Sequence, residues 1–170
     1  MEKYVLSIYV KNHSGVLQRV SGLFSRRGYN IESLSVSVTE RSDISCITIV
    51  VIGDLQILDQ IEKQVLKLVE VISVERLEGD VAVYRELALI KIKTTDENRT
   101  EIIELLNIFR ARIVDVAPSS LIAEVTGDSS KVQSFINTFE RFTILELVRT
   151  GLTAIKRGNQ KRENNKNLNI

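Results

Sequence analysis

The segment Asn12-His13-Ser14-Gly15 carries the residue types in this sequence that are best suited to hold a small charged molecule. A strand pattern ends before it, and a helical pattern begins after it at Val16-Leu17. The first N–H groups of a helix lack internal partners and the helix dipole favours negative charge there, so a carboxylate can dock. Gly15 has no Cβ to block a ligand, and the Asn12 amide can accept from an ammonium or donate to a carboxylate. Together these groups suit a free amino acid.

The same turn also fits a purely structural role. Asn12 or Ser14 can cap the helix while Gly15 eases the turn, so spacing alone leaves the two interpretations level. His13 is expected to face solvent rather than to contact a ligand. A second amide, Asn30, lies between apolar neighbours at the start of another strand pattern and favours binding, although it can also satisfy a loop. The candidate binding site comprises Asn12, His13, Ser14, Gly15, Val16, Leu17, Asn30 and Ile31.

The residues of common catalytic sites are missing from the sequence. It contains one histidine and one cysteine, and no cluster has the spacing of a zinc site. Neither of the glycine-rich phosphate-binding motifs occurs. The carboxylates fall mostly on helix faces expected to be exposed, as Glu62 and Glu104 do. We therefore expect no catalytic residue, no metal site and no cofactor on this chain.

Six elements are expected to position the candidate site in the first half of the chain. Ser33, Ser35 and Ser37 alternate with apolar residues, which predicts an antiparallel strand with one face in water. The remaining patterns predict strands over 4–10, 44–52 and 69–77, a helix with apolar residues Val16, Leu17, Val20, Leu23 and Phe24, and a helix with Leu58, Ile61, Val65 and Leu68. This order predicts two helices on one face of a four-stranded antiparallel sheet.

The same order of elements repeats in the second half, with little residue identity. Strands are expected over 87–92, 113–116, 121–125 and 143–148, with a helix containing Ile102 and Leu106 and a second helix capped by Asp128. The predicted fold class is α+β, with two ferredoxin-like βαββαβ units of four strands each. The expected domains are 1–78 and 84–157, followed by a basic tail over 158–170 that is expected to be disordered.

Composition indicates a soluble protein that associates with other chains. Hydrophobic residues make up 44% and charged residues 26% of the 170 residues, which is ordinary for a globular protein. No apolar run approaches the roughly 20 residues that span a bilayer, and the first residues resemble a strand rather than a signal peptide. We therefore expect a cytoplasmic location and no membrane partner. Each half is small enough to gain stability from an oligomeric contact.

The segments 12–17 (Asn-His-Ser-Gly-Val-Leu) and 25–34 (Ser-Arg-Arg-Gly-Tyr-Asn-Ile-Glu-Ser-Leu) closely resemble the small regulatory subunits of acetohydroxyacid synthase, also called acetolactate synthase. The similarity continues through Gln60-Ile61-Glu62-Lys63-Gln64 and Arg85-Glu86-Leu87-Ala88-Leu89-Ile90-Lys91 to Arg149-Thr150-Gly151. It covers nearly everything before the tail. The resemblance implies that the first half is an ACT domain, an amino-acid-binding module, and that the second half is ACT-like.

The resemblance also implies a shared effector site and a catalytic partner. Two chains would pair through their ACT domains as a homodimer and enclose valine, with leucine and isoleucine as alternatives. By the family pattern, Asn12, Gly15 and the helix start at Val16-Leu17 come from one chain, while Asn30 and Ile31 come from its partner. The chain would activate a separate catalytic large subunit that carries thiamine diphosphate, Mg and FAD, and effector binding would lower the activity of that assembly.

Three other functions compete with this one. An ACT-type amino-acid sensor that regulates a different partner would carry the same turn. An RNA-binding protein has the same element order, but aromatic residues make up only 5% of the chain, no RNA-recognition signature occurs, and small serines cannot stack on bases. We therefore expect no nucleic-acid partner. A self-sufficient enzyme lacks its catalytic groups here.

Overall fold

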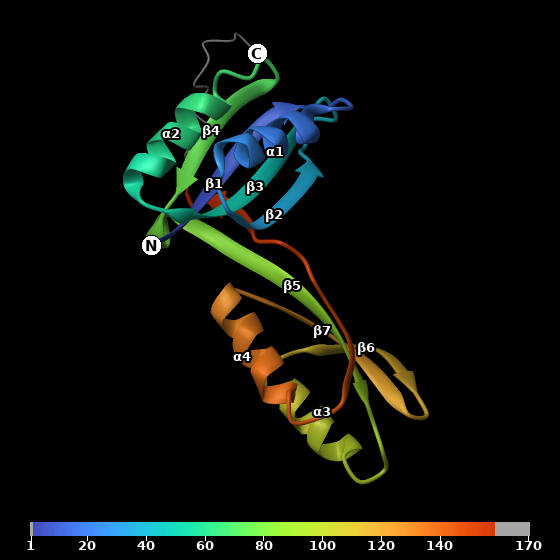
Figure 1. Cartoon of the computed structure of the whole chain (residues 1–170). Coiled ribbons are helices and arrows are strands. Elements are labelled where there is room, and N and C mark those ends of the chain that lie inside the picture. The colour runs from blue at the N-terminus through green and yellow to red at the C-terminus, as the bar shows by residue number, and fades with distance from the viewer. Residues whose placement is uncertain (1, 159–170) are drawn as a thin grey trace. The chain divides into compact units, whose positions relative to one another are not determined.

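The computed structural model describes residues 2–158, and these form two compact units (Figure 1). The first unit contains the residues up to Val83 together with those from Leu152, and the second unit contains Tyr84–Gly151. Within residues 2–158, no helix combines the length and the apolar character needed to cross a membrane. The expected disordered tail lies outside the described residues, apart from Gly158.

The first unit is a four-stranded antiparallel sheet with two helices on one face (Figure 1). In chain order its main elements are β1 (Glu2–Lys11), α1 (Val16–Arg27), β2 (Ile31–Val38), β3 (Ile44–Gly53), α2 (Leu55–Val65) and β4 (Val71–Leu77). The strands lie in the order β2-β3-β1-β4, which makes β2 and β4 the edge strands. The predicted arrangement of this half is therefore confirmed.

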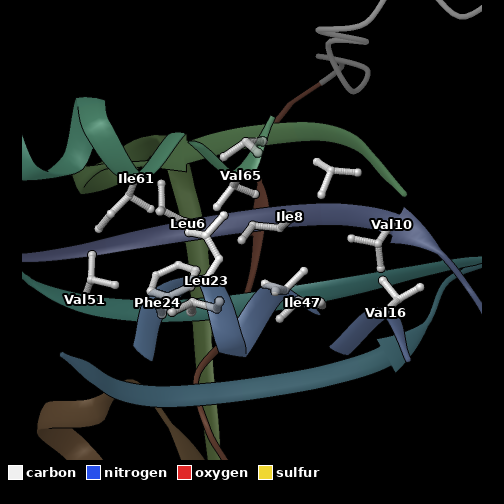
Figure 2. Close-up of a cluster of buried hydrophobic side chains, with 14 of the residues drawn as sticks. Leu6, Ile8, Val10, Val16, Leu23, Phe24, Ile47, Val51, Ile61 and Val65 are labelled. Carbon is white, nitrogen blue, oxygen red and sulfur yellow. The ribbon is translucent and has the colours of Figure 1, made fainter. Parts of the chain in front are cut away.

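The core of the first unit fills the space between the helices and the sheet. Leu6, Ile8 and Val10 lie on the helix side of β1, because side chains alternate between the two faces of a strand. In Figure 2 these side chains gather with apolar residues of both helices, among them Phe24 and Ile61.

Two residues of the predicted helix faces lie outside this core. Leu17 is 40% exposed, because it is one position from the buried Val16 and therefore points about 100° around the helix. Leu68 follows the end of α2 and only packs against the edge of the core. The prediction of these two as members of apolar helix faces is thus corrected.

The second unit repeats this layout. Its elements are most of β5 (Ala82–Lys93), then α3 (Arg99–Ile108), β6 (Arg112–Ala117), β7 (Ser120–Gly127), α4 (Ser129–Phe139) and β8 (Ile144–Arg149), with the strands in the order β6-β7-β5-β8. The centre of its core is aromatic. The centroid of the Phe135 ring lies 5.4 Å from that of Phe109 and 4.8 Å from that of Phe139. The antiparallel α+β fold predicted for this half is confirmed.

A short strand after the second unit differs from the prediction. β9 (Thr153–Lys156) pairs with β5, so the second sheet has five strands rather than the four that the sequence predicts. β9 nevertheless belongs to the first unit, where Leu152 and Ala154 are buried. The short helical turn η1 (Gly79–Val81) precedes β5, and the N–H of Arg157 donates to its Val81 carbonyl. The compact second unit therefore ends at Gly151.

Asp128 caps α4 as the sequence predicts, and its removal should weaken the second unit. Its carboxylate accepts from the Lys131 N–H at 2.8 Å and from the Ser130 hydroxyl, and these bonds lower its pKa. We expect Asp128→Ala to reduce the free energy of unfolding by about 1 kcal/mol in a urea titration at pH 7. A lowered pKa means that the cap acts above the ordinary aspartate pKa and is lost as pH falls through the lowered value.

The exposed Ser134→Ala on the same helix is the control, because it leaves the cap intact. Equal stability of Asp128→Ala and the unmodified chain at pH 7 would show that the cap contributes nothing.

Candidate functional site

Asn12 is held at one corner of the first sheet, on the turn that joins β2 to β3. Its backbone N–H donates to the Asp43 carbonyl at 2.8 Å, and its side-chain Nδ2 donates to the Ser42 carbonyl at 2.8 Å. The side-chain oxygen has no hydrogen-bond partner within the described residues, and the residue is exposed. Asn12 therefore positions the turn with its amide nitrogen and presents an acceptor to a ligand with its oxygen.

Arg41 and Asp43 support this corner, although neither is among the residues that the sequence predicts for the site. The Arg41 guanidinium donates to both carboxylate oxygens of Asp43, at 3.1 and 2.7 Å. This contact lowers the pKa of Asp43 and keeps its negative charge paired. The polar run Glu40–Asp43 was the signal available in the sequence, but it predicts a turn without predicting which residue the turn holds.

Gly15 is the N-cap of α1 and leaves the helix start open. It adopts a left-handed conformation with φ of 87°, and it supplies no side-chain cap. A Cβ at this position would meet no atom within 4 Å, so the space above the helix start is free. The N–H groups of Leu17 and Gln18 have no acceptor among the described residues. These are the donors that an anion would use.

The other helices within residues 2–158 carry negative charge at their N-termini. Asp54 accepts from the Ile57 N–H at the start of α2, and Asp128 does the same for α4. Glu101 lies in the first turn of α3. α1 has no acidic residue in its first turn or at its cap. In the described part of the chain, α1 is thus the α-helix without an acidic residue at its cap or in its first turn, and the nearby carboxylate of Glu70 is ion-paired with Arg19.

The remaining predicted residues of this turn differ in the groups that they can present to a ligand. His13 is exposed and its Nδ1 lies 3.2 Å from the Ser14 carbonyl, while the Ser14 side chain faces solvent. Val16 is only 4% exposed and its side chain packs into the core, so it can contribute its backbone but no apolar lining. Leu17 is the apolar side chain that the turn exposes.

Asn30 and Ile31 lie at the start of β2, after the end of α1. Gly28 closes α1 in a left-handed conformation, and the N–H of Tyr29 donates to the Phe24 carbonyl. Asn30 is exposed, and Ile31 is half-buried opposite Val51 of β3.

One chain does not bring the two parts of the predicted site together. Asn12 binds the turn that follows β2, whereas Asn30 precedes β2. The strand between them, Ile31–Val38, spans roughly 23 Å at about 3.3 Å per residue. The two parts therefore lie at opposite ends of the same edge strand.

That edge strand has an unpaired side and exposed apolar residues. β2 pairs with β3 alone within its sheet. On its helix side, Val36 is 44% and Val38 is 51% exposed. An edge with exposed apolar residues is suited to pair with another strand.

The corresponding corner of the second unit is closed. Arg99, at the start of α3, donates to the carbonyls of Ala117 and Pro118 and to the Thr94 hydroxyl. The Asn98 side chain accepts from the Thr95 N–H, and Asp96 and Glu97 add negative charge. The second unit thus lacks the open helix start that the first unit has. No group of three or more potential metal ligands occurs within residues 2–158.

Comparison with known proteins gives matches over both units. The family described as "AHAS small subunit-like ACT domain" matches residues 6–73, and the family described as "Small subunit of acetolactate synthase" matches residues 85–158. The probable acetolactate synthase small subunit of Archaeoglobus fulgidus is 52% identical, over 94% of this chain and 99% of its own length. The chain belongs to the acetolactate synthase small-subunit family.

Other members of the acetolactate synthase small-subunit family align over similar lengths. The probable small subunit of Methanothermobacter thermautotrophicus is 48% identical, over 94% of this chain and 95% of its own. The crystal structure of the Thermotoga maritima acetolactate synthase small subunit superposes with a TM-score of 0.89 at 41% identity, covering 94% of this chain and 100% of that one. The chain is thus a regulatory ACT-domain subunit, and catalysis belongs to a separate large subunit.

Proposed function

We propose that this acetolactate synthase small subunit binds a branched-chain amino acid, chiefly valine, at the start of α1. It activates the catalytic large subunit and lowers the activity of the assembly when the amino acid is bound. The open N-terminus of α1 carries this proposal, because its free N–H groups, at a helix start without an acidic cap, suit the carboxylate of an amino acid. Membership of the family supplies the partner.

Each part of the amino acid has a matching group at this corner. The carboxylate accepts from the N–H groups of Leu17 and Gln18, and the ammonium donates to the side-chain oxygen of Asn12. The exposed side chain of Leu17 lies beside the apolar part of the ligand. Asn30 and Ile31 supply a second amide and a second apolar side chain, provided that they come from another chain.

A two-fold dimer through β2 supplies them. If β2 pairs antiparallel with β2 of a second copy, the start of each strand meets the end of the other. The end of β2 shares its corner with Asn12, because Asn12 binds the turn that follows it. Asn30 and Ile31 of the partner then approach the open helix start. The dimer contains two such sites, and each is incomplete without the other chain.

In the proposed assembly, thiamine diphosphate, Mg²⁺ and FAD belong to the large subunit, and this chain acts on them only through its contact with that subunit. Valine lowers activity if it binds one arrangement of the two subunits more tightly than the other.

Titration and reconstitution test this function together. We expect calorimetry to show valine binding with one site per chain, and to rank leucine and isoleucine within about 1 to 3 kcal/mol of valine. Addition of the chain should raise the acetolactate synthase activity of the purified large subunit, and valine should then lower it. A chain that neither binds these amino acids nor changes the activity of the large subunit would refute the proposal.

Mixing two variants tests whether the site is shared. Asn12→Ala and Asn30→Ala should each abolish valine binding as homodimers. After unfolding and refolding together, a mixed dimer contains one site with both substitutions and one intact site, so about a quarter of all sites should recover. Refolded single variants are the controls. If the site lay within one chain, the mixture would bind no valine at all.

A further inference from the structure

The side of β2 that carries no helix holds a segment from the far end of the chain. The serines of β2 alternate onto this side, and the sequence predicts that they face water. Instead, Ser33 Oγ accepts from the Leu152 N–H at 3.1 Å, and Ser35 Oγ donates to the Leu152 carbonyl at 2.6 Å. Two hydroxyls thus hold both polar groups of one peptide residue. We call Ser33, Leu152 and Ser35 the serine clamp.

The segment that follows the clamp is buried on the first unit. Leu152 is 6% and Ala154 is 7% exposed. Lys156 ends β9 with its Nζ 3.5 Å from a carboxylate oxygen of Glu75 on β4. The clamp is therefore the first of several contacts that fasten residues 152–156 to the first unit, and it joins them to β2, whereas Lys156 joins them to β4.

The residues just before the clamp are fastened within the second unit. The Leu87 N–H donates to the Thr150 hydroxyl at 3.0 Å, and the Thr150 N–H donates to the Leu87 carbonyl. Arg149 donates to the Glu86 carboxylate at 2.8 Å. Gly151 alone joins these contacts to the clamp. The Cα atoms of Thr150 and Leu152 are therefore never more than roughly 7 Å apart.

We propose that the serine clamp transmits the state of β2 to the second unit. This inference rests on the proposed function, because β2 begins at Ile31, directly after Asn30, and forms the edge of the proposed dimer beside the effector. A shift of β2 on effector binding carries Leu152 with it through two hydrogen bonds. The single intervening glycine then passes the displacement to Thr150 and to β5 and β8 of the second unit. The clamp is a coupling element and not part of the effector site.

Removal of the clamp should leave valine binding intact while weakening the inhibition that binding causes. We expect Ser33→Ala/Ser35→Ala to bind valine within about twofold of the unmodified chain, while the maximal inhibition of the reconstituted enzyme falls by more than about half. Hydrogen exchange at the Leu152 amide should become faster in this variant, which reports loss of the clamp independently of activity. A chain with Gly-Gly-Ser inserted after Gly151 keeps both sets of contacts but lengthens the tether by roughly 10 Å. It should lose inhibition in the same way.

Ser37→Ala is the matched control, because Ser37 lies on the same side of β2 and, within residues 2–158, its hydroxyl donates to the neighbouring Val38 carbonyl and not to Leu152. It should keep both valine binding and inhibition. Full inhibition in both the clamp variant and the insertion variant, with the unmodified enzyme inhibited by valine, would overturn the coupling role alone. A failure of valine to bind the unmodified chain would instead overturn the proposed function.

Discussion

Gly15→Asp is expected to abolish valine binding and valine inhibition while activation of the large subunit is retained. The new carboxylate would stand at the helix start, where we propose that the ligand carboxylate docks. Two like charges about 4 Å apart repel by about 4 kcal/mol at an effective dielectric constant of about 20, which weakens binding on the order of 1000-fold. Calorimetry and inhibition curves of the reconstituted enzyme measure the two effects.

Gly79→Asp is the control that distinguishes charge repulsion at the helix start from the strain of placing an aspartate in a left-handed backbone. Gly79 also has positive φ, at 50°, and a Cβ there meets no atom within 4 Å. The control therefore introduces the same side chain into a similarly left-handed backbone away from the Asn12 corner, and valine binding should be unchanged. If the two variants bound valine equally well, the anion site would not be at the start of α1. Loss of activation together with inhibition in folded Gly15→Asp would show that the two functions share a site.

Positive charges placed on the exposed edge of β2 should also have a large effect on valine binding. We expect Val36→Lys/Val38→Lys to convert the dimer into monomers in sedimentation velocity and to remove valine binding with it. Both residues are about half-exposed, so the substitution places ammonium groups on the pairing edge with a limited cost to the fold. Binding is lost because each site of the proposed dimer takes Asn30 and Ile31 from the second chain.

The second unit offers two valines as a matched control for this test. Val114 and Val116 lie on its own edge strand, β6, and are 51% and 62% exposed. Val114→Lys/Val116→Lys therefore adds the same charges to an equivalent edge, and valine binding should persist. A β2 variant that remains dimeric and binds valine would place the dimer contact elsewhere. The same result would remove the support for a shared site.

Local patterns were sufficient to predict most of the elements. The alternation of apolar residues in β1 and β2, the helical spacing in α1 and α4, and the cap at Asp128 each involve neighbours within a few residues. Such patterns reflect the geometry of a single element. β9 had no such signal, because it has four residues and its position depends on partners far away in sequence.

The residues of the candidate site were also predictable one by one, but their arrangement was not. Asn12, Gly15 and Asn30 were selected by residue type, since an amide and a glycine at a helix start favour binding of an amino acid. Hydrogen bonds between distant segments decide that Asn12 lies at the far end of β2 from Asn30. No periodicity encodes such a separation.

For this protein, the sequence by itself determined the family, the order of the elements and the residue types around the open start of α1. The tertiary structure decided that the first N–H groups of this helix have no acceptor among the described residues, that Val16 is turned into the core, and that Leu152 is held by Ser33 and Ser35. The physical reason is the sequence distance over which the deciding interactions act. Helix starts and strand faces follow from residues that are neighbours in sequence. Whether a helix N-terminus stays open, a side chain is buried, or two segments more than a hundred residues apart form hydrogen bonds depends on which distant parts of the chain pack together.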